Sequence, residues 1–263
     1  MNVRCIIGCL CCCGTLFGQG PELDQAAFSP GPFLAVEQSH WSIFRNMAGM
    51  AAIESHRLVV GYHLPYQLSE LRSMMIGAIF VSKPALGISI YQTGGEILQN
   101  QQLALSTATR FDNVSVGVRV KYWRTSISGL TPFSTAMLDV GLQFSLTDKL
   151  SAGSYITNIT GSKAGTDHLL PIIMASGIRY QAVQKLLLLF EVAHRMGEFL
   201  EFRLGFDYQL KNRFYARTGY TSSGRQFYFG FVFQTFKLEL DYALTLSPWL
   251  GAVHQTGISY SWP

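Results

Sequence analysis

The sequence has no cysteine beyond residue 13 and little charge of either sign. Without later cysteines, the rest of the chain can build no disulfide framework and no thiolate site. Charged residues make up 14% of the chain, against about 25% in ordinary soluble domains. The formal net charge of +4 provides no strongly basic surface, so we expect no nucleic-acid partner. The five cysteines are Cys5, Cys9, Cys11, Cys12 and Cys13.

Long hydrophobic runs are also missing after residue 20. The longest is Leu186–Phe190, whereas a membrane-spanning helix needs about 20 apolar residues. The composition is nevertheless 48% hydrophobic and 13% aromatic. A chain this apolar that has no spanning helix belongs to one of two classes, a soluble all-β fold or a transmembrane β-barrel.

Alternation with a period of two residues is the dominant pattern, as residues 224–246 illustrate. Every odd position from Phe227 to Phe233 is Phe, and the apolar positions from Leu238 to Leu246 are the even ones. A period of two is typical of a β-strand, and the reversal of parity between the two runs predicts a tight hairpin.

The same alternation recurs along the chain and predicts about fourteen strands, separated by turn residues and by connections that alternate between short and longer. The strand ranges are 54–66, 72–82, 84–93, 97–111, 113–125, 133–146, 149–159, 168–182, 184–195, 198–210, 212–221, 224–235, 236–247 and 250–262. Charged residues segregate to one face, which avoids a cost of roughly 2–4 kcal/mol for each charge that would face lipid. We expect the following to face the lumen: Arg119, Lys121, Asp139, Glu191, Glu201, Arg203, Asp207, Arg213, Arg217, Lys237, Glu239 and Asp241.

The last strand runs to the end of the chain, because Ile258, Tyr260 and Trp262 alternate up to the penultimate residue. A sheet edge cannot remain open in lipid, so this strand is expected to pair with the first one. The sequence therefore predicts an all-β, antiparallel up-and-down barrel of about 14 strands in a bacterial outer membrane, with membrane lipids around it. A soluble β-sandwich is the alternative.

Three segments are expected along the chain. Residues 1–20 have a basic start, an apolar stretch and small residues at the end, which is typical of a secretory signal peptide; lipid acylation at Cys9 is an alternative. Residues 21–53 contain Pro30 and Pro32 and do not fit a membrane strand. They are expected to form an N-terminal plug, or else a periplasmic tail. Residues 54–263 are expected to form the barrel.

The stretch "SIFRNMAGMA" (42–51) resembles the "NPAGLA" element of the long-chain fatty-acid transporter superfamily of outer-membrane barrels, which includes the PorV/PorQ group associated with type IX secretion. The matching residues, taken as the plug motif, are Asn46, Ala48, Gly49 and Ala51, while Met47 stands in place of the proline. "GYHLPYQLSELRS", "VGVRVKYWRTSISG" and "AMLDVGLQFSLTDKLSAGSYITNI" are similar to later parts of these relatives. The resemblance implies fourteen strands and an N-terminal hatch inside the barrel.

The resemblance implies two functions. The first is that of a PorV/PorQ-like docking or shuttle component in protein secretion, with secretion machinery or exported proteins as partners. The alternative is a passage for small hydrophobic molecules, with Pro84 and Gly87 supplying a kink for lateral exit. Loops 126–132, 160–167 and 247–250 are the expected recognition surface for a partner, because extracellular loops carry specificity.

The sequence offers no pattern typical of an enzyme. The six histidines form no close ligand pair, and no nucleophile elbow, phosphate-binding loop or dinucleotide-binding motif occurs. We therefore expect no catalytic residues, no metal and no cofactor. The alternative is a hydrolase site at the barrel rim, for which His194 and Glu191 would be candidates.

Overall fold

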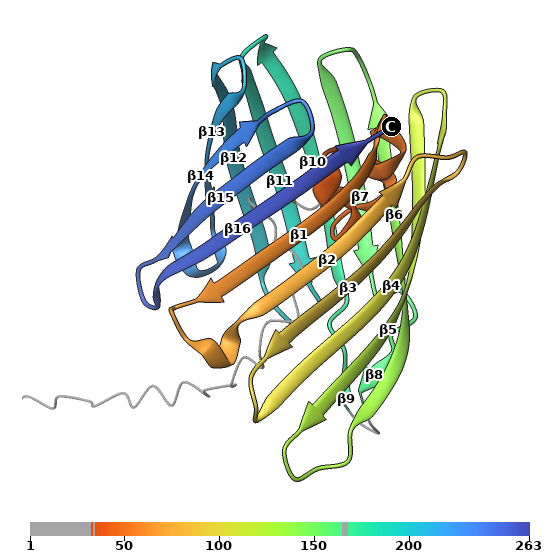
Figure 1. The fold of residues 1–263 in the computed structure, drawn as a ribbon, viewed down its shortest axis with the longest axis vertical. Helices are drawn as coiled ribbons and strands as arrows, with labels where there is room; N and C mark the ends of the chain where they lie inside the picture. The colour runs from red at the N-terminus through yellow and green to blue at the C-terminus, as the bar shows by residue number, and fades with distance from the viewer. Residues whose placement is uncertain (1–32, 34, 165–167) are drawn as a thin grey trace, which may run out of the picture.

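The computed structural model describes residues 33, 35–164 and 168–263. Within them, fourteen antiparallel strands form one closed barrel in the order β1-β16-β15-β14-β13-β12-β11-β10-β7-β6-β5-β4-β3-β2 (Figure 1). This confirms the predicted architecture. The expected signal peptide, residues 1–20, lies outside the described part of the chain. No helix among the described residues is long and apolar enough to cross a membrane.

The strands of the barrel lie close to the predicted ranges, with one correction. The range 168–182 was expected to be a single strand, but His168–Leu169 (β9) pairs with Lys163–Ala164 (β8) in a separate two-stranded sheet, and the barrel strand begins only at Ile173. The barrel strands are β1 His56–Pro65, β2 Ser73–Phe80, β3 Ala85–Gly94, β4 Leu98–Phe111, β5 Val114–Ile127, β6 Phe133–Ser145, β7 Leu150–Thr157, β10 Ile173–Val183, β11 Leu186–Arg195, β12 Leu200–Lys211, β13 Phe214–Thr221, β14 Gln226–Gln234, β15 Leu238–Ser247 and β16 Gly251–Trp262. The 3-10 helices are η2 His40–Ile43, η3 Met47–Ala52, η4 Ser69–Leu71 and η5 Ser223–Arg225.

The barrel is closed by its first and last strands, as expected from the alternation at the end of the chain. β1 and β16 pair along their full length, from His56 opposite Trp262 to Pro65 opposite Val253. Closure leaves no sheet edge whose backbone groups would have to be buried in lipid without partners.

The two faces of the sheet differ in the way the hydrophobic pattern predicts. The four Phe side chains from Phe227 to Phe233 point outward and are 44–50% exposed, whereas Glu239 and Asp241 of the neighbouring strand are buried inside. An apolar exterior around a polar interior is the architecture of bacterial outer-membrane barrels, which confirms the predicted location. The reversal of parity at 235–237 is the β14–β15 turn, with Gln234 opposite Glu239.

The connections give the barrel two unlike ends. At the end that also holds the C-terminus (Figure 1), successive strands are joined by turns of two to four residues, such as 112–113 and 184–185. The opposite end, here called the long-loop end, carries the extended connections, of which 158–172 is the longest. In outer-membrane barrels the short turns lie on the periplasmic side and the long loops outside.

Candidate functional site

The interior of the barrel is occupied by residues 35–53, here called the plug, whose helices are seen as orange coils inside the wall in Figure 1. The plug is buried at its centre, with Trp41, Ile43, Met47 and Met50 fully inaccessible to solvent. The hydroxyl of Ser39 accepts a hydrogen bond from Trp41 N and caps η2. η3 packs against β4, β5 and β6. A short apolar helical segment thus replaces water in the lumen.

Asn46, the first residue of the expected plug motif, anchors the plug to the barrel wall. Its side-chain amide donates to the carbonyls of Ala35 (2.7 Å), Leu142 (3.1 Å) and Ser154 (3.2 Å). Its side-chain oxygen accepts from Ala48 N at 3.1 Å and so caps η3. One side chain therefore begins the helix and also bonds to β6 and β7.

The rest of the motif packs tightly within the plug. Ala48 is completely buried, and Ala51 packs against the apolar cluster of the lumen. Gly49 lies directly against the backbone of Glu37, where a β-carbon would collide with the carbonyl oxygen. Met47, which stands where the resemblance has proline, buries its whole side chain in the same cluster.

Inward-facing glycines make room for the plug. At each of seven positions around the wall, an added β-carbon would lie in contact with a plug atom or would overlap it. Since Gly lacks a β-carbon, these positions let the plug approach the sheet closely. They are Gly61, Gly77, Gly87, Gly117, Gly141, Gly153 and Gly257. Gly205 makes room in the same way for the ring of Phe33, which precedes the plug.

We expect Gly141→Val to displace the plug, because its side chain would occupy the position of the Asn46 amide. Overpacking of this kind costs about 1–3 kcal/mol. The measurement is the rate of limited proteolysis within residues 35–53 in detergent, which should rise. Ala78→Val, which changes an outward position on β2, serves as the matched control and should leave the cleavage rate unchanged. Equal cleavage in both variants would contradict the role assigned to the glycine.

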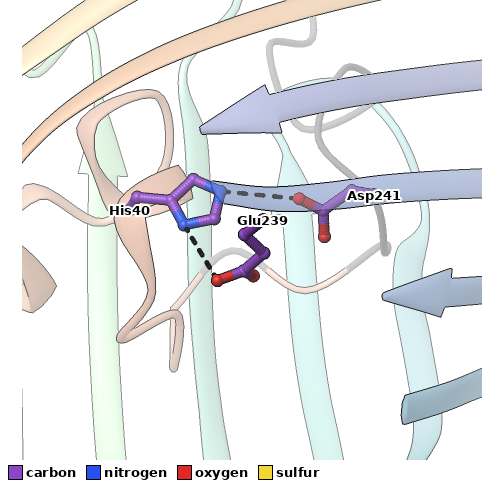
Figure 2. Close-up of side chains that lie close together, drawn as sticks. All are labelled: His40, Glu239 and Asp241. Atoms are coloured by element: carbon purple, nitrogen blue, oxygen red, sulfur yellow. Dashed lines mark ion pairs between the residues drawn. The ribbon is translucent and has the colours of Figure 1, made fainter. Parts of the chain in front are cut away.

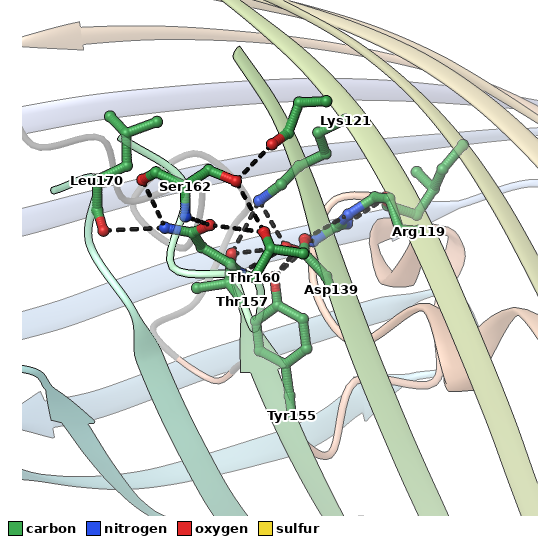
Figure 3. A network of polar contacts seen from close by, with 11 residues as sticks. Arg119, Lys121, Asp139, Tyr155, Thr157, Thr160, Ser162 and Leu170 are labelled. Carbon is green, nitrogen blue, oxygen red and sulfur yellow. Dashed lines mark hydrogen bonds and ion pairs between the residues drawn. The ribbon is translucent and has the colours of Figure 1, made fainter. Parts of the chain in front are cut away.

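The Asp139 carboxylate lies at the centre of a fully buried polar network that spans β5, β6 and β7 (Figure 3). Arg119 donates to Asp139 Oδ2 from Nε (2.9 Å) and Nη2 (2.7 Å). Lys121 Nζ lies 2.8 Å from the other carboxylate oxygen, Asp139 Oδ1. Tyr155 and Thr157 donate their hydroxyl protons to the same carboxylate, at 3.2 and 2.8 Å. A buried charge is tolerated when it is paired and hydrogen-bonded in this way.

This network joins the plug to the longest outer loop. On one side, Arg119 Nη1 donates to the carbonyl of Ile43 in the plug at 2.8 Å. On the other side, Asp139 Oδ1 accepts from Asn158 N at 2.9 Å, and the Asn158 side chain donates to Leu170 O, also at 2.9 Å. A continuous chain of charged and neutral hydrogen bonds therefore connects η2 with loop 158–172.

A second ion cluster holds the start of the plug. Glu191 Oε2 accepts from the backbone N of Ala35 at 2.7 Å, while its Oε1 accepts from Arg203 Nη1 at 3.0 Å. Arg203 also donates to Glu201 through Nε. Glu191 is an inward-facing residue of β11 and has no exposed surface. The carboxylate is thus shared between the wall and the plug.

A third cluster lies where η2 meets β13 and β15. Trp41 Nε1 donates to Asp241 Oδ2 at 3.3 Å. Arg217 pairs with Asp207 at 3.2 Å and lies 3.7 Å from Asp241 Oδ1. His40 and Glu239 border the same carboxylates. Together, the three clusters distribute plug contacts over three separate sectors of the wall.

Two charges expected in the lumen lie elsewhere. Arg213 and Lys237 are exposed residues of the β12–β13 and β14–β15 turns, and the Arg213 guanidinium stacks over the ring of Phe236 at 4.3 Å. Strand parity alone predicts that both side chains face the lumen. However, β13 begins at Phe214 and β15 at Leu238, one residue after each charge, so the pleat of the strand does not set the direction of these side chains. The other ten residues of the expected set occupy inward-facing positions of their strands. Most of them are buried, and the partly exposed ones, Glu201, Asp207 and Arg217, form ion pairs.

Sequence reasoning missed the ion pair inside the plug. Arg45 Nη1 lies 2.8 Å from Glu37 Oε2 and also donates to Phe33 O. Burial opposes ionisation of Glu37, but the guanidinium groups of Arg45 and Arg217 more than offset it and lower the pKa of Glu37 from 4.5 to about 2. This pair therefore contributes stability at neutral pH that is lost as the pH falls toward 2. Glu37 and Arg45 are eight residues apart in a segment without regular periodicity, so the sequence pattern did not predict this ion pair.

A polar cavity opens near the short turns. Its volume is about 470 Å³, and its lining includes Arg45, Arg179, Asp207, Arg217 and Tyr228. A smaller pocket of about 30 Å³ lies beneath loop 158–172 at the other end of the barrel. Most of its lining is apolar: Trp123, Met137, Leu170, Pro171 and Ile173, with Gln102, Lys121 and Thr157 beside them. The plug and the Asp139 network lie between the two ends.

The fold is that of known outer-membrane channels. No family model and no curated protein matches the chain. Among solved structures, the chain is similar to the Pseudomonas putida toluene transporter TodX, with a TM-score of 0.63, 11% identity, and coverage of 90% of this chain and 99% of that one. A mutant TodX monoaromatic hydrocarbon channel gives a TM-score of 0.70 at 10% identity, covering 89% of this chain and 96% of its own. A Pseudomonas aeruginosa FadL homologue gives 0.62 at 12% identity, with the same coverage of 89% and 96%.

Proposed function

We propose that the protein is a plugged outer-membrane channel for small hydrophobic molecules, the alternative function considered from the sequence. The observation that carries this proposal is the apolar pocket beneath loop 158–172, which is lined by Trp123, Met137 and Leu170. Ligand sites are concave and mostly apolar, with a few polar groups that fix orientation. The fold shared with a toluene transporter and a FadL homologue supports the same class of ligand.

Entry of a ligand requires the outer loop to move. The pocket of about 30 Å³ has room for about one or two water molecules, so a larger ligand must displace part of its lining, which includes Leu170. Leu170 is tied to the plug through Asn158, Asp139 and Arg119. Displacement of Leu170 by a ligand would therefore strain the hydrogen bond between Arg119 and the plug carbonyl of Ile43.

The exit route runs through the lumen and past the plug. A lateral opening at a kink formed by Pro84 and Gly87 was expected, but β3 pairs without a register shift with β2 and with β4, including Gly87 opposite Ile79 and Ser106. Gly87 instead makes room for Met50 and Ile43 of the plug. The polar cavity near the short turns then receives what passes the plug.

We expect Leu170→Arg to reduce uptake at least about fivefold, because it buries a charge in the apolar pocket without a partner. The measurement is accumulation of radiolabelled toluene, and separately of a radiolabelled long-chain fatty acid, by bacteria that express the protein. Leu169→Arg is the matched control, since Leu169 is 48% exposed. Undiminished uptake in Leu170→Arg, with the barrel folded, would argue against the pocket as the entry site.

A second candidate function is the PorV/PorQ-like docking or shuttle role in type IX secretion. Exposed aromatic side chains in the connections 196–199 and 248–250 at the long-loop end favour it: Phe199 is 97% exposed and Trp249 78%. Exposed aromatic residues of this kind are enriched in protein interfaces. Chemical crosslinking in intact cells tests this role. We expect a discrete crosslinked protein that is lost in Phe199→Ser/Trp249→Ser if docking is the function, and none if the protein is solely a channel.

A further inference from the structure

His40, Glu239 and Asp241 converge from two elements that lie far apart in the sequence (Figure 2). His40 begins η2 in the plug, while Glu239 and Asp241 are alternate, inward-facing residues of β15. His40 Nε2 lies 3.6 Å from Asp241 Oδ2, and its Nδ1 lies 3.9 Å from Glu239 Oε2. One candidate donor atom from each residue lies within 4.8 Å of the other two.

One nitrogen of the buried His40 imidazole makes no hydrogen bond. His40 is 3% exposed, and its Nε2 has no hydrogen-bond partner among the described residues. The separations of 3.6 and 3.9 Å are too long for hydrogen bonds. Asp241 Oδ1 is likewise buried without a hydrogen bond among the described residues. Buried polar atoms left in this state are costly and call for a specific explanation.

The charge of the cluster also favours a bound cation. Arg217 is held mainly by Asp207, at 3.2 Å, and is farther from Asp241 Oδ1, at 3.7 Å. Arg57 Nη1 is 3.9 Å from Glu239 and remains 22% exposed. Two buried carboxylates therefore converge on one imidazole, and Arg217 and Arg57 approach them only to 3.7 and 3.9 Å. A divalent cation between the three side chains would add positive charge beside both carboxylates.

We propose that His40, Glu239 and Asp241 bind one divalent transition-metal ion that fastens the plug to the barrel wall. Metal–ligand bonds of about 2.1 Å at a tetrahedral angle set donor atoms about 3.4 Å apart, close to the separation between His40 and Asp241. One imidazole and two carboxylates suit Zn²⁺, Co²⁺ or Mn²⁺ rather than Ca²⁺, which prefers six to eight oxygen ligands. Water would complete the coordination.

The ion would link η2 to β15. Trp41, the next residue of η2, already donates to Asp241 Oδ2 at 3.3 Å, and this hydrogen bond orients the carboxylate as neighbours of metal ligands commonly do. Ligands on both the plug and the wall mean that metal binding stabilises only the plugged state. Removing the ion should therefore loosen the plug without unfolding the barrel.

The test uses the exported protein after removal of the expected signal peptide, whose five cysteines would themselves bind Zn²⁺. It is purified in detergent with an affinity tag that lacks histidine and is stripped with a chelator. Metal content is measured after equilibrium dialysis against about 10 µM Zn²⁺, which is well above the dissociation constants that binding free energies of about 10–16 kcal/mol imply, and Co²⁺ absorption reports the coordination geometry. We expect one equivalent per chain. His40→Gln and Glu239→Gln should each weaken binding at least about tenfold.

His254→Gln is the matched control, because His254 bonds to Tyr242 Oη at 2.9 Å and faces away from the lumen. It should bind metal like the unchanged protein. Failure of the stripped protein to bind, or equal binding in His40→Gln and His254→Gln, would overturn the proposal. A heat-modifiable band on gels checks that each variant retains its barrel, so that lost binding cannot be ascribed to misfolding.

Discussion

Asp139→Asn is expected to lower the free energy of unfolding of the barrel by about 3–5 kcal/mol, since it leaves buried cations without their counter-charge. Asp139 has no exposed surface and accepts from both Arg119 and Lys121. The asparagine keeps the volume of the side chain but not its charge, so packing is little altered. The free energy is measured by urea titration of the protein in lipid vesicles, followed by tryptophan fluorescence.

Glu201→Gln provides the control for this experiment. Glu201 also pairs with an arginine, Arg203, but its side chain is 21% exposed at the edge of the lumen. Ion pairs that reach solvent contribute about 0–1 kcal/mol, so the expected loss is correspondingly small. Equal losses in the two variants would mean that the surroundings of Asp139 are wetter than its burial indicates.

Deletion of residues 35–53 is expected to turn the closed barrel into an open pore. The plug fills the lumen with Trp41, Ile43 and Met47, and a barrel of this size has space for water once that filling is removed. Single-channel conductance in planar bilayers should rise on the order of tenfold or more above that of the unchanged protein. Deletion of residues 129–131 in an outer loop is the control and should leave the conductance low.

The outcome of the deletion distinguishes two ways of sealing the barrel. A large, stable conductance would show that the plug alone blocks the lumen. A conductance that stays low although the barrel is folded would contradict this and indicate that loop 158–172 seals the outer end by itself. The conductance of Asn46→Ala should lie between those of the unchanged protein and the deletion variant. This substitution removes the three hydrogen bonds to Ala35, Leu142 and Ser154 but keeps the plug.

The wall of the barrel was predictable because lipid outside and plug inside impose one periodic requirement on every strand. Alternation such as that from Phe227 to Phe233 fixes the face of each residue as soon as the strand is recognised. The prediction of which residues lie in barrel strands and face the lumen was wrong beyond the ends of the strands. Arg213 and Lys237 lie in turns, and His168–Leu169 pairs with β8 rather than with the barrel. At such positions local turn geometry determines the direction, and parity carries no information.

The candidate site was harder to predict because its contacts join distant parts of the chain. The charges on β5, β6, β11 and β12 were assigned to the lumen from parity, but their specific partners were not. Ile43 O, for example, meets Arg119 from 76 residues away. His40 and Glu37 gave no signal, since a plug without regular periodicity hides which side chains face the wall. Within the plug, only the motif residues Asn46, Ala48, Gly49 and Ala51 stood out, and they did so through the resemblance.

The distribution of plug contacts has a consequence for biogenesis. The plug touches Arg119, Glu191 and Asp241, which lie 76, 156 and 200 residues beyond its own contact points, and β1 pairs with the final strand. We infer that in the unchanged protein the sheet folds around the plug during assembly and that the seam between β1 and β16 closes last.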